Sequence, residues 1–189
     1  MTTIDPNILS TDRLILRPLT ESDAPDLFQI YAHPEVMRYW ASPPWTVMEQ
    51  ARQRIVRSQE AFATGSDLQF GMERRNDHTL LGTCSVFSFN KPSRRAEMGY
   101  ALGRPFWGNG YMNEALHALL DYAFHTLNLH RLEADIDPRN LASAKTLERL
   151  GFQKEGHLRE RWIVNDEISD TVFYGLLDRE WAEQKKTER

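Results

Sequence analysis

The segment Arg104–Ala115 constrains the fold of this chain more than any other, and its sequence is RPFWGNGYMNEA. The residues before the glycines, Glu97–Leu102, read as a strand, and Met112–Leu127 has the apolar spacing of an amphipathic helix. Gly108 and Gly110 lie between the predicted strand and the predicted helix. Glycine permits a positive φ and lets a ligand approach the backbone closely. Since the first turn of a helix offers unpaired N–H groups and a partial positive charge, this junction predicts a phosphate-binding turn.

The two common nucleotide fingerprints do not match this turn. The P-loop pattern needs a lysine directly after its second glycine, and Tyr111 follows Gly110 instead. The dinucleotide pattern G-x-G-x-x-G needs a third glycine where Asn113 stands. A nucleotide-phosphate enzyme is therefore disfavoured, and a bare G-x-G is also compatible with an ordinary turn.

Residue periodicity predicts one mixed α/β domain over residues 1–189, of the α+β type. The predicted strands are Leu14–Leu19, Leu68–Arg74, Leu80–Phe89, Arg95–Leu102, Arg131–Ile136, Phe152–Ile163 and Ser169–Leu177. Predicted helices start after Thr20, at a capping box formed by Thr46 and Glu49, after Gly110, at Ala142 and in the charged tail. The helix from Ala142 should end at Leu150, because Gly151 suits a C′ position.

Composition excludes several classes of protein. A net charge of −4 argues against general nucleic-acid binding. No apolar run is long enough to span a membrane, and one cysteine, Cys84, cannot form an internal disulfide, which favours a cytoplasmic protein. The six histidines show no spacing typical of metal ligands, so we expect no metal site.

Two runs of residues carry a family resemblance. They are WGNGYMNEA from Trp107 and NLASAKTLERLGF from Asn140. Both resemble the GNAT superfamily of acetyl-CoA-dependent N-acetyltransferases, and within it the RimJ/RimL-type enzymes named for acetylating the N-termini of ribosomal proteins. Further matching segments are Ser10–Leu19, Ala96–Tyr100, Leu129–Leu132 and Asp170–Trp181, so the resemblance covers nearly the whole chain in order.

The resemblance implies a GNAT fold, with a central, mostly antiparallel seven-stranded sheet flanked by helices and splayed between its fourth and fifth strands. Acetyl-CoA would lie in that split as co-substrate. The residues expected to bind it are Tyr100, Ala101, Leu102, Trp107, Gly108, Asn109, Gly110, Tyr111, Met112, Asn140 and Ser143. Pro105 departs from the family pattern, which usually has Gln or Arg there. Arg104 either supplements the phosphate-binding charge or is a solvated arginine. Asn140 and Ser143 suit helix caps equally well.

The resemblance also suggests catalytic residues. Many family members carry a tyrosine four residues before the Gly-Phe pair, and this chain has Leu147 there. Ser143 lies one turn earlier on the same helix face, so it is the candidate proton donor or thiolate stabiliser. Glu97 is the first candidate for a general base, and Glu160 is the second, since Trp162 would share its strand face.

The acceptor is expected to be a primary amine, with a protein or peptide N-terminal α-amine favoured by the RimJ/RimL resemblance. The alternatives are a small-molecule amine, such as an aminoglycoside, a polyamine or an amino-acid analogue, and a non-catalytic acyl-CoA-binding regulatory module on the same fold. Tyr39, Trp40 and Trp45 are candidates for the acceptor-side wall, although aromatic residues also suit a core. The protein could be a monomer or a homodimer.

Overall fold

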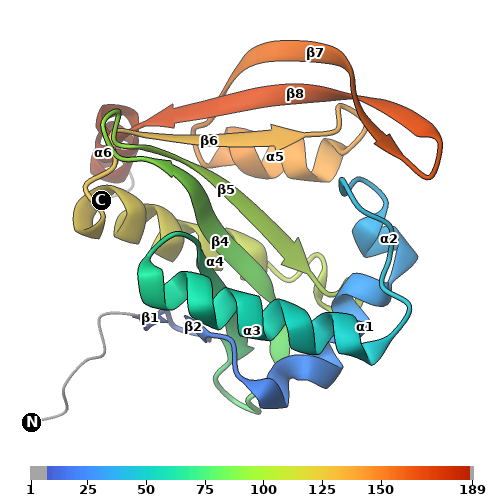
Figure 1. Cartoon of the computed structure of the whole chain (residues 1–189). Coiled ribbons are helices and arrows are strands. Elements are labelled where there is room, and N and C mark those ends of the chain that lie inside the picture. Colours follow the sequence, from blue (N-terminus) through green and yellow to red (C-terminus); the bar gives the residue numbers. More distant parts are fainter. Residues whose placement is uncertain (1–7, 188–189) are drawn as a thin grey trace, which may run out of the picture.

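A computed structural model describes residues 8–187, which form one eight-stranded sheet flanked by helices (Figure 1). The strand order is β1-β2-β3-β4-β5-β6-β8-β7. The strands are β1 (Leu9–Ser10), β2 (Leu14–Pro18), β3 (Leu68–Arg74), β4 (Leu80–Asn90), β5 (Arg95–Leu102), β6 (Arg131–Ile136), β7 (Gln153–Val164) and β8 (Glu167–Leu177). All neighbouring pairs are antiparallel except β5 and β6, which run parallel.

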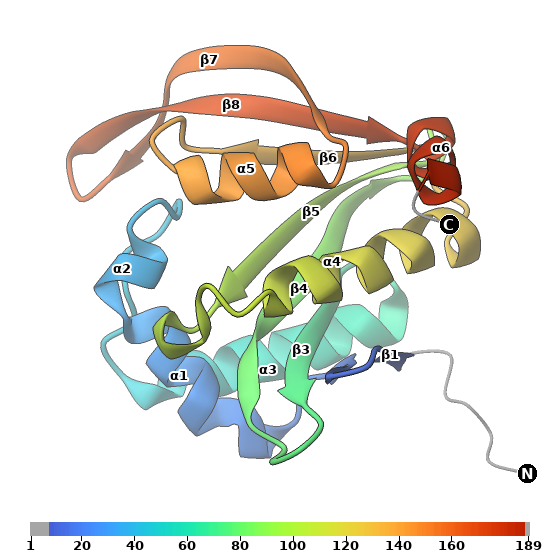
Figure 2. The same ribbon diagram turned by 180° about the vertical axis from the view of Figure 1, so that it is seen from behind.

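Helices cover both faces of the sheet. They are α1 (Ala24–Ala32), α2 (Pro34–Met37), α3 (Met48–Thr64), α4 (Tyr111–Asp121), α5 (Leu141–Arg149) and α6 (Asp178–Thr187). Helices α1 and α3 lie on one face, and α4 and α5 lie on the other, as the two opposite views show (Figures 1 and 2). None of the helices in residues 8–187 is long and apolar enough to cross a membrane.

The buried apolar residues form two clusters, one on each face of the sheet. The larger joins β2–β6 and β8 to α4, α5 and α6, with Leu116, Leu119 and Leu132 fully buried in it. The smaller joins α1, α2 and α3 to the sheet and contains Ile30 and Ala101. Alternate residues of β5 therefore point to opposite faces of the sheet, as strand geometry requires.

The sheet opens between β5 and β6. These strands pair over three residues only, from Arg95 opposite Arg131 to Glu97 opposite Glu133. Beyond that point β5 stays paired with β4 up to Leu102, while β6 stays paired with β8 (Figure 1). The two halves of the sheet thus diverge, and the β6-facing edge of β5 beyond Glu97 is left without a neighbouring strand.

This architecture confirms the predicted GNAT fold. All seven predicted strands are present, and the two-residue β1 adds an eighth, so the predicted fourth and fifth strands are β5 and β6. One local prediction was wrong. Helix α3 begins after Val47, and the Gln50 side chain, rather than Glu49, accepts the N–H groups of Thr46 and Val47. The predicted cap was placed one residue too early.

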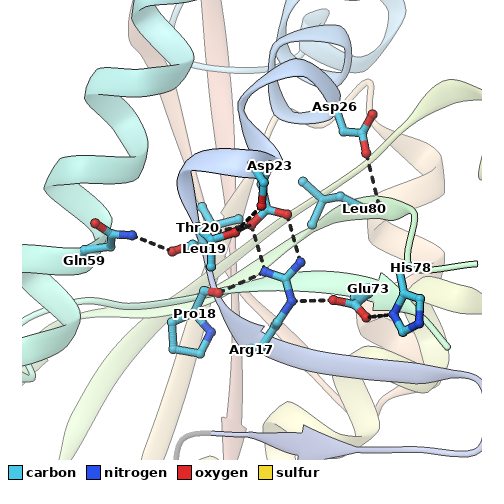
Figure 3. Close-up of polar contacts among 11 residues, drawn as sticks. Arg17, Pro18, Leu19, Thr20, Asp23, Asp26, Gln59, Glu73, His78 and Leu80 are labelled. Carbon is cyan, nitrogen blue, oxygen red and sulfur yellow. Dashed lines mark hydrogen bonds and ion pairs between the residues drawn. The ribbon is translucent and has the colours of Figure 1, made fainter.

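An ion-pair network ties the start of α1 to the sheet (Figure 3). The Arg17 guanidinium donates two hydrogen bonds of 2.8 Å to the Asp23 carboxylate, and its Nε donates to Glu73. The second Glu73 oxygen lies 2.6 Å from His78 Nδ1. Burial opposes ionisation of Asp23 and Glu73, but Arg17, with Thr20 and His78, holds the pKa of each carboxyl below its ordinary value.

We expect Arg17→Met to lower the free energy of unfolding by about 3 kcal/mol, because it leaves two largely buried carboxylates without their cation. Urea unfolding followed by circular dichroism measures this. Arg52→Met is the matched control, since Arg52 lies on the exposed side of α3 and pairs with Glu49 at 3.7 Å in solvent.

The same network predicts how the effect depends on pH. A lowered carboxyl pKa gives stability that is present above the ordinary value and is lost as pH falls through the folded value. The ordinary values are 3.8 for Asp23 and 4.5 for Glu73. The cost of Arg17→Met should therefore shrink as pH falls below about 4, where protonated carboxyls need no cation. A cost that does not change with pH would contradict the network's role.

Candidate active site

A cavity of about 570 Å³ lies at the open end of the sheet. Its walls come from β5, β6, the segment after α2, the start of α5 and the β7–β8 hairpin, which are distant in sequence. Two of the predicted catalytic residues, Glu97 and Ser143, line it, as do Tyr100 and Asn140. The divergence of β5 and β6 therefore brings these four side chains to one cavity.

Glu97 lies at the point where the two strands separate. It is on the side of β5 that carries Ala101, so it faces the α1–α3 side. Within residues 8–187 its carboxylate makes no hydrogen bond or ion pair. Burial, followed by the negative charges of Asp135 and Glu133, raises the pKa of the Glu97 carboxyl above its ordinary value. A carboxylate with a raised pKa and no bonded partner suits proton abstraction.

Tyr100 and Ser143 meet across the opening on the other side of β5. The Tyr100 hydroxyl lies 2.6 Å from Ser143 Oγ, and the Ser143 backbone N–H donates to Asn140 Oδ1 at 3.1 Å. Asn140 is thus the cap of α5, and Ser143 is 9% exposed. Leu147 is fully buried one turn further along α5. Burial raises the pKa of Tyr100 to about 12, so this hydroxyl stays protonated at neutral pH.

The glycine turn forms an open concavity at the start of α4. Gly108 and Gly110 both have positive φ, 77° and 78°, which a residue with a Cβ adopts only at a cost. A Cβ on Gly108 would meet no atom of the described chain within 4 Å, so the space in front of it is open. Gly110 is the N-cap of α4 and has no side chain to bond the first-turn N–H groups. This geometry suits an anion.

Arg13 holds this turn in place from the far end of the chain. Its Nη1 donates to the Asn109 carbonyl at 3.0 Å, and its Nε bonds Glu114 of α4 at 2.6 Å. The guanidinium also stacks 4.5 Å from the centre of the Tyr111 ring. Nothing in the local sequence links Arg13 to a turn 96 residues away, so its role at this turn was not predicted.

The remaining predicted cofactor residues surround the same region. The Leu102 carbonyl accepts the Trp107 indole N–H at 2.7 Å, and the Asn109 side chain bonds the carbonyls of Phe106 and Trp107. Ala101 points its side chain into the α1–α3 cluster, so only its backbone faces the opening. Met112 packs at the rim of the larger cluster.

Arg104 is not a free phosphate ligand in this structure. Its Nε donates to Glu35 at 2.8 Å, and its guanidinium stacks on the Trp107 ring at 4.8 Å. Through these two contacts the exposed Arg104 side chain links Glu35 of α2 to the glycine segment.

Glu160, the second candidate base, was expected on the same strand face as Trp162, but only Trp162 lines the cavity. The register of β7 against β8 shifts between Leu158 and Trp162, and Glu160 has a φ of +54°. Its side chain is exposed and is not part of the cavity wall, whereas Trp162 is. The prediction that Glu160 and Trp162 share a face was wrong, because a bulge breaks the strand alternation.

One wall of the cavity is aromatic. Tyr39 and Trp40 line it, whereas Trp45 stacks on Tyr31 at 4.7 Å and does not line the cavity. Three cavity carboxylates besides Glu97 have arginine partners: Asp135 lies 3.9 Å from Arg161, and Asp137 and Glu167 both bond Arg139. Among residues 8–187 no group of three or more His, Cys, Asp or Glu side chains is placed to hold a metal ion.

The arrangement supports transfer of a group between two molecules. An anion-binding turn and two hydroxyls lie on the α4–α5 side of β5, and a carboxylate lies on the other side. A phosphorylated carrier would enter along the first side and a protonated nucleophile along the second. The two would meet in the opening between β5 and β6.

Comparison with known proteins agrees with this geometry. Residues 13–153 match the acetyltransferase (GNAT) domain family. Among relatives, the uncharacterized N-acetyltransferase p20 of Bacillus licheniformis is 38% identical over 92% of this chain and 98% of its own length. The ribosomal protein uS5-alanine N-acetyltransferase of Escherichia coli is 29% identical, covering 92% of each chain.

Two further proteins resemble this chain. The spermidine N(1)-acetyltransferase of Escherichia coli is 27% identical over 91% of this chain and 90% of its own length. The crystal structure of spermidine N-acetyltransferase from Vibrio cholerae, in complex with CoA and spermine, superposes with a TM-score of 0.80 at 23% identity. It covers 91% of this chain and 99% of that one, and it shows the same fold.

Proposed function

The chain belongs to the GNAT acetyltransferase family and is an N-acetyltransferase, and we propose that its acceptor is the α-amine at the N-terminus of a protein or peptide. The observation that carries this proposal is the cavity at the β5–β6 opening, with Glu97 on one side of β5 and the Tyr100–Ser143 pair on the other. A base for the amine and hydroxyl donors for the leaving group thus flank one space.

The residues present fit acetyl-CoA. The glycine turn offers first-turn N–H groups of α4 and an open space that a Cβ would fill, which suits the diphosphate. Arg13, which is paired with Glu114, holds the Asn109 carbonyl and so fixes the shape of this turn. The free edge of β5 from Tyr100 to Leu102 offers backbone groups to the amide-bearing arm, because β6 no longer pairs with it. Asn140 lies at the same opening.

Gly108→Ala should weaken acetyl-CoA binding at least about tenfold, or about 1.4 kcal/mol, because a methyl group would enter the diphosphate space. Isothermal calorimetry measures this. Gly65→Ala is the matched control: Gly65 also has a positive φ of 67° and open space around it, but it ends α3, away from the site. Equal affinities of the two variants would show that the turn does not bind the cofactor.

Acetyl-CoA supplies an activated acetyl group: the amine nitrogen bonds the acetyl carbon, the carbon–sulfur bond breaks, and its electron pair leaves on sulfur. Glu97 takes the proton that the amine must lose, directly or through water. Its raised pKa makes it a stronger base than an exposed carboxylate. Ser143 faces the side where the sulfur would depart.

Glu97→Gln should lower the rate about 10²-fold at neutral pH and recover part of it at alkaline pH, where more of the amine is already neutral. In the wild type the rate should fall as pH decreases through the raised pKa of Glu97, because the protonated carboxyl cannot accept a proton. Steady-state kinetics over a pH series measure both.

Glu160→Gln is the control for this experiment, because Glu160 is an exposed glutamate outside the cavity wall. Its rate and pH profile should follow the wild type. A constant ratio of Glu97→Gln to wild-type rates across pH would contradict the assignment of Glu97 as the base.

Chemistry favours an α-amine as acceptor. An α-amine has a pKa of about 7.7–8.0, against about 10.4 for lysine, so a carboxylate base deprotonates it far more easily at neutral pH. The Tyr39 and Trp40 wall can hold the first side chain of a peptide, while Glu97 meets the amine. The relative that acetylates the alanine of uS5 supports this choice of acceptor.

A polyamine is the second candidate acceptor, supported by the spermidine-acetylating relative and by the carboxylates in the cavity. A polycation needs several carboxylates without cationic partners. Here Asp137 and Glu167 share Arg139, and Asp135 lies 3.9 Å from Arg161, so two arginines offset part of the charge of these three carboxylates. The site is therefore less suited to a polyamine than to a single α-amine.

One assay tests the acceptor. We expect a peptide that begins with alanine and contains an internal lysine to be acetylated at its α-amine, and the same peptide with a blocked N-terminus to be inert. Mass spectrometry of the products locates the acetyl group, with spermidine as a parallel acceptor. Acetylation of lysine alone, or of spermidine alone, would contradict the α-amine proposal and leave the N-acetyltransferase activity intact.

A further inference from the structure

The Tyr100–Ser143 hydrogen bond joins β5 to α5 across the opening of the sheet, within the cavity. Tyr100 lies on β5 and Ser143 on α5, which packs against the β6–β8 half. Their oxygens are 2.6 Å apart, and both residues line the cavity.

Either oxygen of this pair can be the donor, and the acidity of the two hydroxyls favours one direction. A phenol is much more acidic than an alkyl hydroxyl and is therefore the better donor. The Ser143 backbone carbonyl is a second acceptor for the Tyr100 proton, but at 3.5 Å it is much further away than Ser143 Oγ at 2.6 Å. The Ser143 backbone N–H donates to Asn140 Oδ1, which fixes the backbone there. If Tyr100 donates to Ser143 Oγ, the serine's own proton is left to be donated into the cavity.

We propose that Tyr100 is a positioning residue that orients the Ser143 hydroxyl proton toward the departing sulfur, so that the pair stabilises the CoA thiolate by hydrogen bonding. This inference rests on the proposed function and deepens it. The side chain that sets the direction of the bond comes from β5, while the hydroxyl that contacts the sulfur comes from α5. The opening of the sheet is what allows the two to meet.

The acidities of the groups decide between hydrogen bonding and proton transfer. An unperturbed thiol has a pKa of about 8.5. Burial raises the pKa of Tyr100 to about 12, and an alkyl hydroxyl is no more acidic, so neither group gives its proton to a thiolate at equilibrium. A hydrogen bond to an ionised acceptor is nevertheless about twice as strong as a neutral one. The proton balance closes because the amine's proton goes to Glu97 and the thiolate is protonated later from solvent.

The test is the pKa of the thiol of CoA bound to the protein, followed by the ultraviolet absorbance of the thiolate. In the wild type this pKa should lie below that of free CoA. Tyr100→Phe and Ser143→Ala should each raise the pKa of the bound thiol by about one pH unit or more, because each variant loses a hydrogen bond to a charged group. The double variant should differ little from either single one, because the two groups act in series.

Two controls separate this role from a structural one. Desulfo-CoA lacks the thiol, so its affinity should be the same for wild type and Tyr100→Phe. Tyr122→Phe makes the same change at a tyrosine that packs on Phe70 away from the cavity, and the thiol pKa should not move. The turnover number with acetyl-CoA should fall in Tyr100→Phe while acetyl-CoA affinity is kept.

Three results would overturn the inference. An unchanged thiol pKa in Tyr100→Phe that still binds CoA would show that Tyr100 does not orient the donor. A raised pKa in Tyr100→Phe with none in Ser143→Ala would show that Tyr100 acts on the sulfur directly. Equal loss of CoA and desulfo-CoA affinity would show a structural role. Failure of the wild type to bind CoA would instead contradict the proposed function.

Discussion

The short parallel pairing of β5 with β6 is the constraint on which the site depends. Three residue pairs hold the strands together, and the ladder stops at Glu97 and Glu133. Arg95 and Arg131 both bond Glu133, which belongs to the last of these three pairs. Two cations therefore meet one carboxylate at the point where the strands separate. Every feature of the cavity follows from the divergence beyond this point, because a continuous sheet would leave no space between its strands.

The two halves carry different chemistry because a strand presents alternate side chains to opposite faces. On β5, Glu97 faces the α1–α3 side and Tyr100 faces the α4–α5 side. A carboxylate and a hydroxyl therefore face one small space from two directions without contacting each other. On the second side, Arg13 bonds both Asn109 and Glu114 and so fixes the glycine turn against α4.

Local sequence signals predicted most of this fold. The alternation of apolar residues located the strands, and Gly151 marked a helix end and has a positive φ. The errors were local as well. A bulge in β7 moved Glu160 out of the cavity, and no periodic pattern reveals where one extra residue enters a strand.

The sequence by itself determined the elements, the glycine turn and the family, because backbone preferences and motif spacing depend on neighbouring residues. It also nominated Glu97 and Ser143, which the structure brings to one cavity. Only the tertiary structure decided that Tyr100 meets Ser143, 43 residues away, and that Arg13 reaches Asn109. These contacts depend on how far β5 and β6 diverge and on how α4 and α5 pack, and such long-range packing has no signature in a local stretch of sequence.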